Sequence, residues 1–125
     1  MRLPIQYAFS YPERWTAPLP PLDLTRAGRL EFELPDTTVF PALTLAYRAL
    51  AQERSLPVVL NAANEVAVAR FLEGRLGFHA IAHVIESAMQ AHRPAQVGNV
   101  AEVRALDHWA RAQADEIARA VELKT

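Results

Sequence analysis

The distribution of proline constrains this chain more than any other feature of its sequence. Eight of the nine prolines lie at or before Pro57, and only Pro94 follows. Proline fixes its own φ angle and lacks the backbone N–H that helices and sheets use, so a proline-dense stretch resists regular structure. We therefore predict a mainly α protein in two parts. Residues 1–36 form an extended arm or linker, and residues 37–125 form a small bundle of about four helices.

The first predicted helix of the bundle opens at Phe40-Pro41, with proline in its first turn. Its apolar residues recur every three or four positions, which is typical of a helix with one buried stripe. That stripe consists of Phe40, Leu43, Tyr47 and Leu50. The segment from Ser55 to Pro57 is expected to break this helix.

Three further helices complete the predicted bundle. Asn61 is well placed as the N-cap of the second helix, which a glycine ends. The third spans about 78–91. Asn99 can cap a short turn, and we expect a break before a main helix over about 107–121, for which Asp107 offers the N-cap.

The arm carries three local signals. Pro4 suits the first position of a short helix, which Tyr11-Pro12 ends. Residues 16–22 are typical of polyproline II, and we interpret them as a stiff connector. Residues 30–34 alternate apolar and acidic side chains, which predicts one short strand.

That strand has no evident partner in the chain. No second convincing strand occurs, and the backbone groups of a strand must be paired or hydrated. The strand is therefore either exposed or paired with protein outside these 125 residues. We take this as a first indication that the chain is not a complete folding unit.

Charge and composition disfavour several functional classes. Thirteen basic and 14 acidic residues are spread along the chain and give a net charge of -1, so we expect no nucleic-acid partner. No run of about 18 apolar residues occurs, so we expect no membrane span and a cytoplasmic protein. The absence of cysteine excludes disulfides and thiolate metal sites. The four glycines are too widely spaced for a nucleotide-binding loop.

One group of side chains has the spacing of a metal site. His79, His83 and Glu86 lie at positions i, i+4 and i+7 and could converge on one helix face to hold a divalent metal. The alternative, which we favour, is a solvated polar strip, because no HExxH motif or fourth ligand accompanies them. His92 and His108 are interpreted as ordinary surface histidines.

An ordered set of short segments resembles one enzyme family, 1-deoxy-D-xylulose 5-phosphate reductoisomerase. The resemblance begins at Met1-Arg2-Leu3-Pro4-Ile5 and Tyr11-Pro12-Glu13-Arg14, and its most distinctive part is Leu60-Asn61-Ala62-Ala63-Asn64-Glu65-Val66-Ala67-Val68. The other matching segments are Pro21-Leu22-Asp23-Leu24, Leu30-Glu31-Phe32-Glu33-Leu34-Pro35-Asp36, Phe40-Pro41-Ala42-Leu43, Leu45-Ala46-Tyr47, Phe71-Leu72 and Gly77-Phe78. Together they extend over essentially the whole chain.

The resemblance implies the C-terminal portion of an enzyme in three parts. Family members have an N-terminal domain that binds NADPH, a central domain with the divalent-metal ligands, and an arm leading to a C-terminal helical bundle. They convert 1-deoxy-D-xylulose 5-phosphate to 2-C-methyl-D-erythritol 4-phosphate in non-mevalonate isoprenoid biosynthesis, using NADPH and Mg or Mn, and are typically homodimers. The expected partners of this chain are therefore the missing N-terminal and catalytic domains and a second copy.

The same resemblance assigns no catalytic, cofactor-binding or metal residue to this chain, because the residues that do this work in the family lie upstream of the matching segments. We expect the chain alone to be structural and inactive. The alternative is a stand-alone helical interaction module. The two hypotheses differ over four apolar side chains of the arm, which a fragment leaves exposed and an independent module buries: Ile5, Phe9, Leu22 and Phe32.

Overall fold

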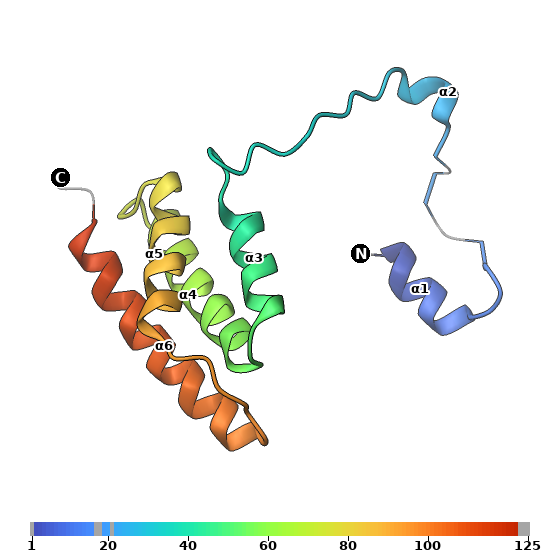
Figure 1. The fold of residues 1–125 in the computed structure, drawn as a ribbon. Helices are drawn as coiled ribbons and strands as arrows, with labels where there is room; N and C mark the ends of the chain where they lie inside the picture. Colours follow the sequence, from blue (N-terminus) through green and yellow to red (C-terminus); the bar gives the residue numbers. More distant parts are fainter. Residues whose placement is uncertain (1, 17–18, 21, 123–125) are drawn as a thin grey trace. The chain divides into compact units, whose positions relative to one another are not determined.

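The computed structural model in Figure 1 describes residues 2–16, 19–20 and 22–122. The chain divides into two compact units, residues 1–34 and 35–125. Within the described residues every regular element is a helix, which confirms the predicted mainly α class. No helix among these residues has the length and apolar character needed to cross a membrane.

The first unit contains helices α1 (Arg2–Ser10) and α2 (Leu24–Ala27). The predicted helix at Pro4 is present, but it begins two residues earlier, so that proline is the third residue of α1. A bend of the chain follows, in which the Ser10 hydroxyl donates a hydrogen bond to the Glu13 carbonyl at 2.6 Å. The predicted polyproline II segment lies partly outside the described residues.

The predicted short strand at Leu30–Leu34 is not present as a strand. These residues adopt no regular structure. A strand exists only through its ladder of hydrogen bonds to a neighbour, and none of the described residues forms one with this segment. The alternating apolar and acidic residues of this segment therefore have no partner strand among the described residues.

Helix α3 (Ala42–Ala51) opens the second unit after a turn at Asp36. The Asp36 carboxylate accepts hydrogen bonds from the backbone N–H groups of Thr38 at 2.9 Å and Val39 at 3.1 Å. Leu45 and Ala49 are the buried residues of this helix. The prediction of the buried stripe is wrong, because all four of its residues are exposed: Phe40, Leu43, Tyr47 and Leu50. Helix α3 is apolar on two sides, and periodicity alone could not say which side meets α4.

Helix α4 (Ser55–Leu72) begins six residues before the predicted N-cap, so Asn61 lies inside the helix. Its side chain instead donates a hydrogen bond to Glu65 at 3.2 Å. Pro57 does not break this helix, because it is the third residue of α4. The first N–H groups of a helix have no acceptor within the helix, so proline is tolerated there.

Helix α5 (Phe78–Ala91) has the predicted bounds. Helix α6 (Val100–Ala120) is one continuous helix, so the expected break near Asp107 is wrong. The Asp107 carboxylate accepts a hydrogen bond from Nε of Arg111 at 2.8 Å, one turn further on, and does not cap a helix. Asn99 does cap, as predicted: its side chain accepts a hydrogen bond from the Glu102 backbone N–H at 2.9 Å.

Helix α4 is central in the second unit and packs against α3, α5 and α6 (Figure 1). The α4–α6 contact is the most extensive, and both helices contribute small residues to the core. Six alanines of these two helices are completely buried: Ala62, Ala63, Ala67, Ala110, Ala114 and Ala118. In α6 they recur every four residues and form one ridge, so the two helices approach closely.

Candidate functional site

The three side chains with the spacing of a metal site, His79, His83 and Glu86, do not form one in the structure. No three His, Asp or Glu side chains in the described part of the chain are placed so that they could hold a metal ion. Glu86 instead faces Arg48 of α3, with 3.7 Å between its Oε1 and the arginine Nη1. The ring of His79 packs edge-on to Phe78, with 5.8 Å between centroids. The residues present therefore do not fit the divalent metal of the resembled family.

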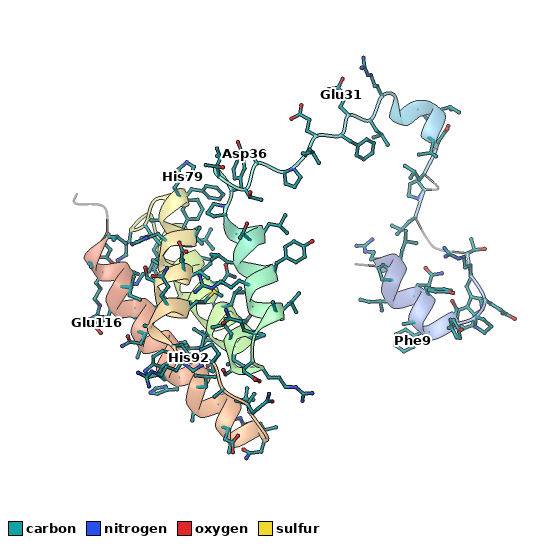
Figure 2. All side chains as sticks on the ribbon, in the orientation of Figure 1. Phe9, Glu31, Asp36, His79, His92 and Glu116 are labelled. Carbon is teal, nitrogen blue, oxygen red and sulfur yellow. The ribbon has the colours of Figure 1, made fainter. Side chains whose placement is uncertain are left out.

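His92 is not the ordinary surface histidine that the sequence suggested. It follows α5, at the opposite end of that helix from His79 (Figure 2), and its Nε2 lies 2.9 Å from the Ser55 hydroxyl. The same hydroxyl accepts a hydrogen bond from the Ala95 backbone N–H at 2.7 Å. The His92 ring also packs against Trp109 at 5.3 Å between centroids.

Partial burial lowers the pKa of His92 below its ordinary value. Since the Ser55 oxygen accepts the Ala95 N–H, the hydroxyl hydrogen is free to point at His92 Nε2, which then acts as the acceptor of a neutral imidazole. No carboxylate of the described residues hydrogen-bonds to this pair, so the arrangement joins the α5–α6 connection to the start of α4 without forming a nucleophile relay. The sequence did contain a sign that His92 is partly buried, because this residue directly follows the apolar helix that ends at Ala91.

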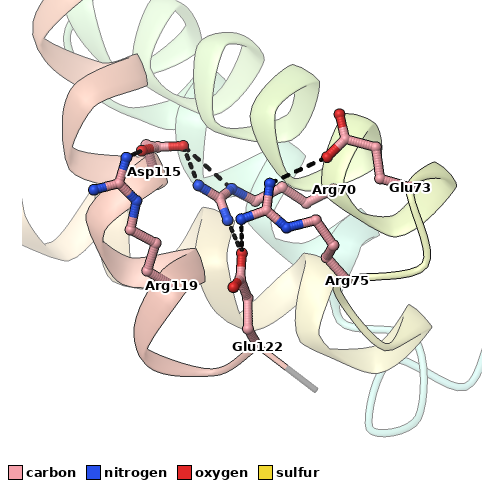
Figure 3. A network of polar contacts seen from close by, with 6 residues as sticks. All are labelled: Arg70, Glu73, Arg75, Asp115, Arg119 and Glu122. Carbon is pink, nitrogen blue, oxygen red and sulfur yellow. Dashed lines mark hydrogen bonds and ion pairs between the residues drawn. The ribbon is translucent and has the colours of Figure 1, made fainter. Parts of the chain in front are cut away.

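A second polar cluster, shown in Figure 3, ties the end of α4 to α6. The Arg70 guanidinium is 7% exposed and contacts the carboxylates of Asp115 and Glu122. Arg75 also reaches Glu122, at 2.7 Å between Nη2 and Oε1. The hydrogen bond from Arg70 lowers the pKa of Asp115 below its usual range. Both carboxylates are paired with arginine, which does not exchange protons, so the cluster acts as a structural link between the end of α4 and α6.

A third cluster joins the same two helices through Arg111. Its Nη2 lies 2.6 Å from Glu65 of α4, and its Nε lies 2.8 Å from Asp107. The hydrogen bond from Arg111 lowers the pKa of Glu65, and the two carboxylates together raise the pKa of Arg111. Glu65 therefore lies in a surface ion pair between α4 and α6.

The feature of this chain that calls for a functional explanation is exposed apolar surface. In the first unit, the four apolar side chains that distinguish the two hypotheses are all exposed in the chain: Ile5, Phe9, Leu22 and Phe32. In the second unit the outer face of α3 is exposed, with Tyr47 at 66% and Leu50 at 76%. Large apolar patches of this kind mark surfaces that contact other protein.

A small cavity continues the apolar face of α3. It measures about 110 Å³ and lies between the start of α3 and the start of α5. Its lining residues are Val39, Phe40, Pro41, Ala42, Phe78, His79, Ile81 and Ala82. Pockets for drug-sized ligands and cofactors hold roughly 300–1,000 Å³. This cavity is therefore too small for a dinucleotide, and it has the size of a single ring or apolar side chain.

Comparison with known proteins extends over nearly the whole chain. The family described as DXP reductoisomerase C-terminal domain matches residues 1–113. The 1-deoxy-D-xylulose 5-phosphate reductoisomerase of Trichlorobacter lovleyi is 50% identical over 117 residues, which are 94% of this chain and 30% of the relative. That of Thermodesulfovibrio yellowstonii is 49% identical over 114 residues, again 30% of its length. The chain thus spans about 30% of the length of these curated relatives.

Solved structures show the same correspondence. The chain is similar to 1-deoxy-D-xylulose 5-phosphate reductoisomerase from Zymomonas mobilis in complex with NADPH, with a TM-score of 0.85 and 38% identity over 96% of this chain and 32% of that one. A DOX-P reductoisomerase in complex with NADPH, fosmidomycin and magnesium has a TM-score of 0.80 at 28% identity, over 94% of this chain and 31% of that one.

Proposed function

This chain belongs to the family of DXP reductoisomerase C-terminal domains, and we propose that it acts as the C-terminal third of a 1-deoxy-D-xylulose 5-phosphate reductoisomerase. The observation that carries the proposal is the match of residues 1–113, supported by relatives that are 49–50% identical and about three times as long. The proposed reaction converts 1-deoxy-D-xylulose 5-phosphate to 2-C-methyl-D-erythritol 4-phosphate with NADPH and a divalent metal, Mg or Mn.

Within that enzyme we assign this chain a structural role. Its described residues do not form a metal site, and its glycines are too widely spaced to cradle the phosphates of NADPH. We propose that the cofactor and metal bind in the part of the enzyme that precedes this chain. Residues 1–36 then act as a connecting arm, and residues 37–125 act as a helical bundle whose exposed apolar faces pack against that preceding part.

The proposal includes two further properties of the whole enzyme, its oligomeric state and its location. We propose a homodimer, which the exposed apolar surface of both units supports. We also propose a cytoplasmic location, which the absence of cysteine supports because it suits a reducing compartment.

A chimeric enzyme tests the proposal directly. The matching C-terminal segment of the Trichlorobacter lovleyi reductoisomerase is replaced by these 125 residues, and NADPH oxidation is followed with 1-deoxy-D-xylulose 5-phosphate and Mg²⁺. We expect activity from the chimera and none from the 125-residue chain alone. The matched control is the relative cut before the replaced segment.

The outcomes separate the two hypotheses. A folded chimera that does not oxidise NADPH with this substrate contradicts the proposal and leaves the stand-alone interaction module. Light scattering on the active chimera tests the dimer, since a monomeric mass would contradict that part alone.

A further inference from the structure

We propose that His92 forms a proton-sensitive latch, which holds the connection between α5 and α6 against the start of α4 and releases it at acid pH while the rest of the bundle stays folded. The latch consists of the contacts among His92, Ser55 and Ala95. All three residues belong to the second unit of this chain, so the inference does not depend on the proposed function.

Hydrogen bonds attach the connection between α5 and α6 to the start of α4. This connection, residues 92–99, contains no helix or strand. The Ser55 backbone N–H donates to the Ala95 carbonyl at 3.2 Å, and the Ala95 N–H donates in return to the Ser55 hydroxyl at 2.7 Å. The Gln96 side chain donates to Glu53, just before α4. The two segments are therefore joined through backbone groups as well as side chains.

His92 completes this attachment from the end of α5 (Figure 2). Its Nε2 lies 2.9 Å from the Ser55 hydroxyl, and its ring packs against Trp109 of α6 at 5.3 Å between centroids. Ser55 is 1% exposed, so water does not reach its hydroxyl. With a neutral His92 ring accepting the hydroxyl hydrogen, no buried side-chain nitrogen or oxygen in the described part of the chain lacks a hydrogen bond.

Protonation of His92 disrupts this arrangement for two reasons. A proton on Nε2 turns that atom from an acceptor into a donor, so the hydrogen of the buried Ser55 hydroxyl loses its acceptor. The imidazole ring also becomes a cation while it is partly buried, and this burial lowers the pKa of His92 below its ordinary value. Release of the connection returns both groups to water, so protonation favours the released form.

The charged residues around the ring do not oppose this effect. Those next to the contacting segments in sequence are Glu53, Arg54, Arg93, Asp107 and His108. Glu53 accepts the hydrogen bond from Gln96, and Asp107 pairs with Arg111. The other three are exposed. Burial is the only cause of the lowered His92 pKa, so no charged group among the described residues shifts it.

Amide hydrogen exchange of the 125-residue chain, followed by NMR between about pH 5 and pH 8, tests the latch. The protection factor of each amide is the ratio of its intrinsic exchange rate to its observed rate at the same pH. For Ser55 and Ala95 we expect constant protection above the ordinary histidine pKa. Below it, protection should fall by about tenfold per pH unit down to the folded-state pKa of His92. Titration of the His92 ring resonances measures that pKa in the same sample.

Low concentrations of urea distinguish release of the connection from unfolding of the whole bundle. Local release exposes little surface, so the protection of Ser55 and Ala95 should respond weakly to urea. The amides of Ala67 and Ala114, in the buried centre of α4 and α6, should lose protection steadily as urea is added. The same urea dependence for all four amides would overturn the inference, because the connection would then open only when the bundle unfolds.

Three variants assign the effect to the latch. His92→Gln should make the protection of Ala95 independent of pH, because glutamine does not titrate, whereas His108→Gln replaces an exposed histidine and should preserve the dependence. Ser55→Ala should lower Ala95 protection at every pH, since the Ala95 N–H loses its acceptor. Persistence of the pH dependence in His92→Gln, or constant Ala95 protection across the pH range in the unaltered chain, would overturn the inference.

Discussion

Arg70 is the one charged residue that is buried among the described residues of the bundle, and its surroundings explain why it is tolerated. Its guanidinium contacts Asp115 and Glu122, so the charge is paired at the point where α4 ends. We predict that Arg70→Met lowers the free energy of unfolding by about 2 kcal/mol, because two carboxylates lose a hydrogen-bonded cation. Urea denaturation measures this loss.

Arg119 provides the control for that prediction. It also contacts Asp115, at 2.7 Å, but its side chain is 69% exposed. An exposed ion pair contributes about 0–1 kcal/mol, so Arg119→Met should change stability little. Equal losses in the two variants would show that burial of Arg70 is not what matters.

His92 predicts a pH dependence of stability. Its folded-state pKa lies below the ordinary value of 6.5, so the unfolded chain binds the proton more tightly than the folded chain does. The stability that neutral His92 contributes is complete above about pH 6.5 and is lost as the pH falls through that value toward the folded-state pKa. Unfolding free energies measured across this range should decrease toward acid pH.

Replacement of single histidines identifies the group responsible. His92→Gln should flatten this part of the pH profile, whereas His108→Gln, on the exposed face of α6, should leave it in place. A profile that stays equally steep in His92→Gln would assign the effect to another residue.

At the scale of single helices, two asparagines test where helices begin. Asn99 caps α6, and the Glu102 carboxylate accepts a hydrogen bond from the Gly98 backbone N–H at 2.8 Å. We predict that Asn99→Ala lowers the free energy of unfolding by about 1 kcal/mol, the usual loss for an N-cap. Thermal or urea unfolding measures it.

For Asn61 we expect no such loss of stability. Because it lies within α4 and not at its start, Asn61→Ala should be neutral or slightly stabilising, since alanine has the higher helix propensity. A loss comparable to that of Asn99→Ala would support the N-cap that the sequence suggested and contradict the observed start of α4.

The contact between α4 and α6 depends on residue size. Ala114 is completely buried in this contact, and a larger side chain there would force the two helices apart. We predict that Ala114→Leu lowers the free energy of unfolding by about 1–3 kcal/mol. Ala112→Leu, on the exposed side of the same helix, should lie within about 0.5 kcal/mol of the parent. Both values come from denaturant titration.

At the scale of the whole molecule, the division into two units predicts how the chain is cut. Trypsin cleaves after arginine, and Arg26 and Arg29 are exposed in the first unit. We expect limited proteolysis to remove the first unit before any cleavage within α4 or α6, leaving a fragment from residue 30 onward that unfolds with the same midpoint as the chain. Mass spectrometry of the digest identifies the sites. Resistance of residues 1–36 would contradict the expected early cleavage of the first unit.

Local sequence signals predicted helices well where one physical cause dominates. The bounds of α5 were predicted because an apolar period of 3.6 lies between a glycine and a proline, and Asn99 was recognised because its side chain caps the helix that follows. The prediction failed at Asn61 and Asp107, where a residue suited to capping lies inside a helix and makes an ion pair or side-chain contact. The sequence shows which residues are able to cap a helix, but the residues around them in the fold decide whether they do so.

Sequence by itself determined that this chain is helical after a proline-rich arm, and its ordered motifs determined the family. It did so because proline spacing, apolar period and motif order act along the chain and need no distant contact. Only the tertiary structure decided which side of α3 meets α4, that His92 lies against Ser55, and that Arg70 joins α4 to α6. These three features depend on which helix surfaces are buried against one another. That burial is decided by contacts between residues that are distant in sequence.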